Sequence, residues 1–220
     1  LLALLIAAKA NVNAASSDYV HNTPLSMAVW KGHSECVKLL LAAPGIDVNK
    51  ADNFGDTPLS WAAREGHSAC VKLLLAAPGI DVNKANNSGC APLDWAARKG
   101  HSECVKLLLA APGIDVNTAV YDGCTPLYWA AGDGHTECVK LLLAAPGIDV
   151  NKANEYGKTP LLCAAWKGHS ECVKLLLAVP SIDVNAADKE YGKTPLYWAA
   201  GDGHSECVKL LLAAPGIDVN

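Results

Sequence analysis

A segment of about 34 residues recurs six times along this chain of 220 residues. Its most constant part, Gly-His-Ser-Glu-Cys-Val-Lys-Leu-Leu-Leu-Ala, begins at Gly32, Gly100, Gly168 and Gly203, and with a single change at Gly66 and Gly134. A fixed period in this range is typical of a solenoid, in which each unit buries its apolar face against its neighbours. The repetition therefore constrains the fold more than any single residue does.

The boundaries of the repeats follow from the Pro-Leu step that opens each copy, at residues 24, 58, 92, 126, 160 and 195. The last interval is one residue longer than the others, so an additional residue enters near Lys189. Cutting after each Val-Asn gives a partial repeat at 1-13 and six repeats at 14-49, 50-83, 84-117, 118-151, 152-185 and 186-220. Because a repeat array has no internal boundary between separate cores, we expect one elongated domain over residues 1-220.

Composition and charge narrow the range of partners. With 51% hydrophobic and 18% charged residues the chain is typical of globular proteins, and it has no run of about 18 apolar residues that could span a membrane. The net charge of -4, with Lys and Arg spread along the repeats, argues against nucleic acid and anionic membranes, which require a concentrated basic surface. We expect a monomer that uses neither as a partner.

Both ends of the chain are apolar. The segment from Leu1 to Ala8 matches the ends of the later repeats and has no basic residue before it, so we predict a helix rather than the core of a signal peptide. The end at 210-220 lacks the polar variant that usually caps a solenoid. Both observations lead us to expect that the sequence was cut from a longer protein.

Each repeat carries the signals of a short first helix. In repeat 50-83, Thr57 is a favourable N-cap and Pro58 suits the first helical position. Gly66 suits the left-handed residue that follows a helix end. These signals predict a helix over about 58-65.

A second helix and an extended finger follow in the same repeat. Ser68 is expected to cap the second helix and Pro78 to end it. The stretch from Ile80 to Asn83 then alternates apolar and polar residues, and the stretch from Asn86 to Gly89 supplies turn residues. Neither helix is long enough to be stable alone, so the repeats must stack.

The order of helix, turn, helix and finger, carried by Thr-Pro-Leu, Ala-Ala, Gly-His, Val-Lys-Leu-Leu-Leu and Asp-Val-Asn, resembles the ankyrin repeat over nearly the whole chain. The resemblance implies an all-α ankyrin-repeat solenoid of stacked helix-turn-helix units with short β-hairpin fingers. Two features depart from the family pattern. The loop after the Leu run is one residue longer, and the His of Thr-Pro-Leu-His is replaced in every copy, by Ser26, Ser60, Asp94, Tyr128, Leu162 and Tyr197. The hydrogen bonds that this His usually makes therefore do not carry over.

Most repeats place a histidine, an acid and a cysteine close together, as in His33, Glu35 and Cys36. An active site needs one pre-organised constellation in a cleft, whereas this group recurs along the array. We therefore interpret Gly-His as the turn between the helices and Cys as a small buried apolar residue. We expect no enzymatic activity and no catalytic residues.

Metal ions, disulfides and cofactors are also not expected. Zinc needs four ligands about 2 Å from the ion, and one His and one Cys per repeat do not converge when repeats stack about 10 Å apart. The same spacing excludes a ladder of disulfides, and the total of nine cysteines is odd. No Gly-rich phosphate loop is present. We expect reduced thiols and a cytoplasmic location.

Positions that differ between copies are the candidates for recognition, because stacking accounts for those that are shared. The resemblance implies that fingers and first helices line a concave groove in which a protein or peptide partner binds. Trp, Tyr and Arg are the residues that most often dominate interface energy. The candidate partner-binding residues are Trp30, Lys31, Phe54, Arg64, Arg98, Lys99, Tyr121, Asp133, Tyr156, Trp166, Lys167 and Tyr191.

The tryptophans fall into two groups. One group shares a register that other copies fill with Met27 and Cys163, and we expect these rings to pack between neighbouring repeats: Trp61, Trp95, Trp129 and Trp198. Trp30 and Trp166 occupy a slot that holds Arg or Gly elsewhere, a range that a core position would not tolerate, so we expect them to contact a partner. For the finger Tyr and Phe rings, partner contact and packing on the next finger both remain open.

Three hypotheses about function follow. The first is a non-catalytic scaffold that binds a protein or peptide on its concave face. The second is a targeting or regulatory arm of a larger enzyme or effector whose catalytic domain lies outside residues 1-220. The third is an elastic or spacing element, which a groove without accessible aromatic residues would favour.

Overall fold

The structure, a computed structural model, describes residues 11-17, 20 and 22-219. These residues form twelve α-helices, and none of them is assigned to a β-strand. The helix expected over Leu1 to Ala8 lies outside the described residues, as does Tyr19 of the first finger.

Each repeat contributes two helices that are joined by a short turn. The first helices are α2 (Pro24–Trp30), α4 (Pro58–Glu65), α6 (Pro92–Arg98), α8 (Pro126–Gly132), α10 (Pro160–Trp166) and α12 (Pro195–Gly201). The second helices are α3 (Ser34–Leu41), α5 (Ser68–Leu75), α7 (Ser102–Leu109), α9 (Thr136–Leu143), α11 (Ser170–Leu177) and α13 (Ser205–Leu212). The predicted helix over 58-65 is confirmed as α4.

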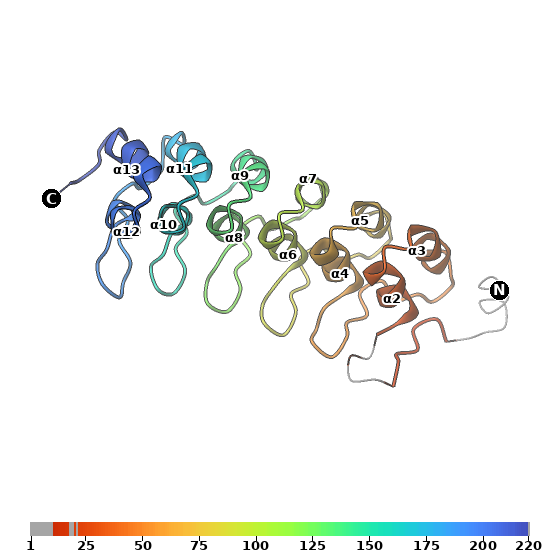
Figure 1. The fold of residues 1–220 in the computed structure, drawn as a ribbon. Coiled ribbons are helices and arrows are strands. Elements are labelled where there is room, and N and C mark those ends of the chain that lie inside the picture. The colour runs from red at the N-terminus through yellow and green to blue at the C-terminus, as the bar shows by residue number, and fades with distance from the viewer. Residues whose placement is uncertain (1–10, 18–19, 21, 220) are drawn as a thin grey trace. The chain divides into compact units, whose positions relative to one another are not determined.

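Contacts divide the chain into two compact units. Unit 1 comprises Leu1–Ala96 and Glu103–Asp115, and unit 2 comprises Ala97–Ser102 and Val116–Asn220. In unit 1, α2 packs on α4 and α3 packs on α5. In unit 2, α10 packs between α8 and α12, and α11 packs between α9 and α13. Within each unit, therefore, first helices form one layer, second helices form another, and the fingers extend beyond the first helices (Figure 1).

The core of each repeat lies between its two helices. Leu59 of α4 and Leu74 of α5 are fully buried in unit 1, and Leu127 and Leu142 occupy the same places in unit 2. Burial of a leucine side chain stabilises the fold by about 2 kcal/mol. Because short helices have little stability of their own, this packing holds them in place.

The first helices begin as the sequence predicts. The Thr57 hydroxyl accepts a hydrogen bond from the Ser60 N–H at 3.2 Å, with Pro58 as the first helical residue. At the other end of α4, Gly66 takes the left-handed conformation with φ of 75°.

The prediction that serine caps the second helices is wrong. Ser68 is the first residue of α5, and the cap position belongs to His67, whose side chain makes no capping hydrogen bond. The imidazole is turned instead toward the preceding repeat, where Nε2 lies 3.1 Å from the carbonyl oxygen of Trp30. The same contact joins His135 to Arg98 and His204 to Trp166. The histidine therefore serves stacking rather than the cap.

Each finger ends in a tight turn, as predicted. In repeat 84-117, the Asn86 N–H donates to the Cys90 carbonyl at 3.0 Å and the Gly89 N–H donates to the Asn86 carbonyl at 2.9 Å. The additional residue near Lys189 lies in the last finger, where the corresponding bond runs from the Asp188 N–H to the Lys193 carbonyl. Neighbouring fingers are linked within unit 1 by a bond from the Asn87 N–H to the Phe54 carbonyl at 2.9 Å.

The stretch from Ile80 to Asn83 is not extended as its alternation predicts. Val82 and Asn83 lie in a turn that forms because the Asp81 carboxylate accepts a hydrogen bond from the Asn83 N–H at 3.1 Å. Both ends of the Asn83 amide then reach the next repeat of unit 1. Nδ2 donates to the Gly113 carbonyl at 2.7 Å, and Oδ1 accepts from the Asp115 N–H at 2.9 Å. Asparagines at the same register form the same pair of bonds: Asn13, Asn49, Asn117, Asn151 and Asn185.

Candidate functional site

The candidate partner-binding residues lie at the surface, on fingers and first helices or directly after them. Arg64 and Trp166 are half-exposed. The others are exposed: Trp30, Lys31, Phe54, Arg98, Lys99, Tyr121, Asp133, Tyr156, Lys167 and Tyr191. Tyr121 is the extreme case, with 73% of its surface accessible. These residues are therefore accessible to a partner.

A hollow of about 420 Å³ lies between two fingers and two first helices of unit 1. We call it the unit 1 hollow; its lining residues are Phe54, Asp56, Trp61, Arg64, Asn86, Asn87, Ser88 and Trp95. Phe54 is 44% exposed at the finger tip, while Asp56 is buried below it. The hollow thus combines an aromatic wall, a guanidinium group and polar finger side chains.

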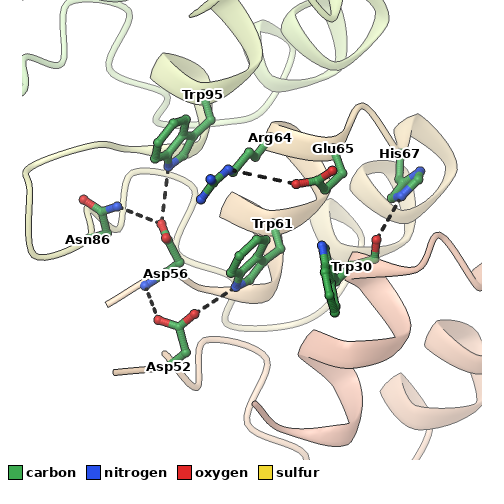
Figure 2. A network of polar contacts seen from close by, with 9 residues as sticks. All are labelled: Trp30, Asp52, Asp56, Trp61, Arg64, Glu65, His67, Asn86 and Trp95. Atoms are coloured by element: carbon green, nitrogen blue, oxygen red, sulfur yellow. Dashed lines mark hydrogen bonds and ion pairs between the residues drawn. The ribbon is translucent and has the colours of Figure 1, made fainter. Parts of the chain in front are cut away.

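Two buried carboxylates hold the indole rings of this hollow in place (Figure 2). Trp61 Nε1 donates to Asp52 Oδ2 at 3.0 Å, and Trp95 Nε1 donates to Asp56 Oδ1 at 3.3 Å. Asp56 Oδ1 also accepts from Asn86 Nδ2 at 2.8 Å. Each half-buried ring therefore has its only polar atom satisfied and its orientation fixed.

The Arg64 side chain lies between the two indole rings (Figure 2). Its guanidinium carbon is 5.1 Å from the Trp61 ring centroid and 4.6 Å from that of Trp95, distances at which a cation is attracted to an aromatic face. Its Nε is 3.9 Å from a Glu65 carboxylate oxygen. The Trp30 ring extends the row, with its centroid 6.1 Å from that of Trp61.

Burial changes the acidity of Asp56. Removal from solvent raises the pKa of this carboxyl above its ordinary value, and the negative charge of Asp52 adds to the rise, while the hydrogen bond from Asn86 opposes it. The two carboxylates are close neighbours, since the Asp56 N–H donates to Asp52 Oδ1 at 3.0 Å. The negative charge of Asp56 is therefore held at a cost to stability.

Replacing Asp56 with asparagine is expected to remove that cost, since the asparagine Oδ1 can still accept from Asn86 and Trp95. A carboxyl whose pKa is raised on folding binds more protons in the folded state, so its contribution to stability falls as the pH rises through that pKa. The difference in stability between the Asp56→Asn variant and the parent should therefore grow in favour of the variant as the pH rises from about 4 to about 7. Urea denaturation at both pH values measures the difference. A difference that stays constant, or that shrinks toward neutral pH, would contradict this account.

Unit 2 presents aromatic and cationic side chains in the same register. The Arg98 guanidinium carbon lies 4.2 Å from the Trp129 ring centroid, and Tyr128 packs edge-on against that ring at 5.5 Å. Further along, the Trp166 and Trp198 rings are 5.4 Å apart, and Trp198 Nε1 donates to Asp188 Oδ2 at 2.8 Å. A carboxylate at the finger base therefore orients an indole in this unit as well.

The expected division of the tryptophans holds only in part. Trp30 is exposed, but Trp166 is half-buried, as are the four rings expected to pack between repeats, Trp61, Trp95, Trp129 and Trp198. The Trp61 ring packs against Trp30 of the preceding repeat and against Arg64, and the Trp198 ring packs against Trp166 of the preceding repeat. The sequence reasoning also missed Asp52 and Asp56. The detectable signal was that the Asp56 position differs between copies, being Asn22, Cys90, Cys124, Lys158 and Lys193 elsewhere.

The cysteines behave as buried apolar residues, with Cys36, which is exposed, as the exception to the prediction. Burial raises the pKa of Cys104 to about 11, with a smaller effect from Glu103. It raises the pKa of Cys124 to about 12, against the effect of a hydrogen bond from Asn154. These thiols stay protonated near neutral pH, and a protonated thiol is a poor nucleophile.

Neither a metal-binding cluster nor a membrane-spanning helix is found among the described residues. No three His, Cys, Asp or Glu side chains come together there as a metal site would require. No helix in that part of the chain is long and apolar enough to cross a membrane.

Comparisons with known proteins agree with the geometry. Models of ankyrin repeats match residues 44–120 and 116–188 as sets of three copies, residues 5–62 as many copies and residues 191–220 as one repeat. The crystal structure of EF0377, an ankyrin repeat protein, is similar with a TM-score of 0.79 and 29% sequence identity, covering 86% of this chain and 96% of that one. A search of curated proteins found no match. Repeats of this kind generally serve as protein interaction modules, and their fold is typically non-catalytic. With family models matching most of its length and a similar solved structure, this chain belongs to the ankyrin repeat family.

Proposed function

We propose that this protein is a non-catalytic scaffold that binds a protein or peptide through the finger tips and first helices of its units. The observation that carries the proposal is the unit 1 hollow. There Trp61 and Trp95 are fixed by buried carboxylates, with Arg64 between them, beside an exposed Phe54. Such an arrangement goes beyond what stacking of repeats requires.

Pre-organisation is the physical reason why this surface suits binding. Ordering a flexible side chain at an interface costs about 0.5–1.5 kcal/mol. The indole rings of Trp61 and Trp95 have already lost that freedom, because each N–H is bound to an aspartate. A partner would therefore bury aromatic surface without reordering it. Interface residues of this type can each contribute about 2 kcal/mol or more.

The candidate residues extend this surface beyond the hollow. Trp30 and Lys31 lie at the end of α2, where the Lys31 amine is 3.9 Å from the Trp30 ring centroid. In unit 2, Arg98 and Trp166 take corresponding positions at the ends of α6 and α10. We propose that a partner contacts several of these positions. The nine free cysteines would suit a reducing compartment such as the cytoplasm.

A random-peptide display library panned on the immobilised protein tests the proposal. We expect selected peptides to bind the parent, and to bind a Trp30→Ala, Phe54→Ala, Arg64→Ala variant about 30-fold more weakly, or worse, because each loss of an interface anchor costs about 2 kcal/mol. Fluorescence anisotropy of labelled peptides measures both affinities. Far-UV circular dichroism verifies that the variant folds.

A matched variant on the opposite layer provides the control. Leu39 and Leu212 are about half exposed and Lys106 is exposed, all on second helices. The Leu39→Ala, Lys106→Ala, Leu212→Ala variant removes comparable apolar surface and one cation, and it should bind as the parent does. Equal loss in both variants, or loss in the control alone, would refute the assignment of the binding face.

A further inference from the structure

Three lysines of unit 2 surround a pair of tryptophans. Lys158 and Lys167 place their amines 4.4 Å and 4.6 Å from the Trp166 ring centroid. Lys193 places its amine 5.4 Å from the Trp198 ring centroid, on the other ring of the pair. We call these five residues the lysine-tryptophan patch.

Two tyrosines border the patch and are accessible to solvent. The Lys193 amine is 4.0 Å from the Tyr197 ring centroid and 5.4 Å from that of Tyr191, and it donates a hydrogen bond to the Tyr197 hydroxyl at 2.6 Å. More than half of each tyrosine surface is exposed. The patch therefore presents flat aromatic surface and ammonium groups together.

The ammonium groups of the patch form no close ion pair among the described residues, although the charge of Lys158 reaches the buried Asp188 carboxylate that holds the Trp198 indole. Among the described residues, no carboxylate oxygen lies within 4.0 Å of the amines of Lys158, Lys167 or Lys193. Lys140 and Lys209, on second helices of the same unit, each pair with a glutamate at 3.3 Å. An ammonium group has three donors, so each patch lysine can accommodate an additional anionic acceptor.

We propose that the lysine-tryptophan patch binds an acidic peptide segment, in which carboxylates alternate with aromatic side chains. The carboxylates meet the three amines, and the aromatic side chains stack on the accessible rings of Trp166, Trp198 and the bordering tyrosines. This inference rests on the proposed function and adds the chemistry of the partner.

Neighbouring acids favour such a peptide over a continuous polyanion. Glu155 and Glu190 are exposed on the finger tips beside the patch, and Asp202 is exposed directly after α12. A nucleic acid backbone, with a negative charge at every phosphate, would face these carboxylates as well as the lysines. A peptide can place its acids only opposite the amines, and like charges across an interface select against the wrong partner.

The test uses a fluorescein-labelled peptide of alternating glutamate and tyrosine, with a second peptide in which glutamine replaces every glutamate. Anisotropy titrations compare the parent with the Lys158→Gln, Lys167→Gln, Lys193→Gln variant. The control variant, Lys140→Gln, Lys174→Gln, Lys209→Gln, removes the same charge from exposed second-helix lysines of the same unit. We expect about a tenfold loss of affinity for the acidic peptide in the patch variant and little change in the control. The glutamine peptide should bind the parent about tenfold more weakly than the acidic peptide.

Each alternative outcome separates this inference from the proposed function. Equal loss of affinity in the two variants would show that net charge alone attracts the peptide. Equal binding of the two peptides would show that the surface does not select acids. Either outcome overturns this inference without bearing on the proposed binding face. Tighter binding of a single-stranded oligonucleotide than of the acidic peptide would overturn it in favour of nucleic acid. If the triple variant fails to fold, the single change Lys167→Gln, at an exposed position, must still lower the affinity for the acidic peptide.

Discussion

Replacing Gly100 with alanine is expected to lower the free energy of unfolding by about 3 kcal/mol. Gly100 has φ of +73°, where a side chain costs about 1 kcal/mol. A Cβ atom at this position would lie 2.5 Å from Nδ1 of His135, much closer than atoms approach one another. His135 would have to move and leave its contact at 3.1 Å with the Arg98 carbonyl, which costs about 2 kcal/mol more.

Gly147 supplies the matched control in the same unit. Its φ is +77°, yet nothing lies within 4 Å of the position that a Cβ atom would take. The Gly147→Ala variant should therefore lose only the conformational part, about 1 kcal/mol. Urea denaturation followed by circular dichroism measures both variants. If they lose equal stability, the contact between glycine and histidine contributes nothing.

Replacing Asn83 with alanine is expected to cost about 2 kcal/mol of stability. The side chain bridges two repeats of unit 1, since it donates to the Gly113 carbonyl and accepts from the Asp115 N–H. A net hydrogen bond contributes about 1 kcal/mol, and alanine removes both bonds.

Asn87 offers a graded comparison for this bridge. Its side chain makes one such bond, from Nδ2 to the Asn53 carbonyl at 3.0 Å, at an exposed finger tip. The Asn87→Ala variant should lose about half as much stability as Asn83→Ala, as judged by the same denaturation experiment. An Asn83→Ala variant as stable as the parent would mean that the bridge is not a source of stability.

Local sequence patterns predict the helices because their signals are local. Thr57, Pro58 and Gly66 act on the backbone within one helix, and α4 has the predicted bounds. The cap of the second helix was misassigned because the role of His67 depends on a carbonyl 37 residues earlier. The turn at Val82 was missed for a similar reason, since hydrogen bonding by Asp81 outweighs the alternating pattern. A single domain over 1-220 stays a prediction.

Comparison of the copies predicts accessible residues more readily than their arrangement. Variation at the Trp30 and Trp166 positions predicts solvent access, because a core would not tolerate Arg and Gly there, and in the structure Trp30 is exposed and Trp166 half-exposed. The carboxylates of Asp52 and Asp56 could not be assigned to Trp61 and Trp95 from spacing, since one bond lies within a repeat and the other joins two repeats. Their pairing depends on how the fingers stack.

Intrinsic tryptophan emission tests the binding face most directly. All six tryptophans lie on first helices, so emission reports on that layer alone. A tryptophan-free peptide selected from the library, and labelled for an independent measure of binding, is titrated against the protein. We expect emission to shift to shorter wavelength in parallel with binding, because the peptide excludes water from the rings. Saturating binding without any change in emission would contradict the account, since the peptide would then occupy a surface away from the first helices.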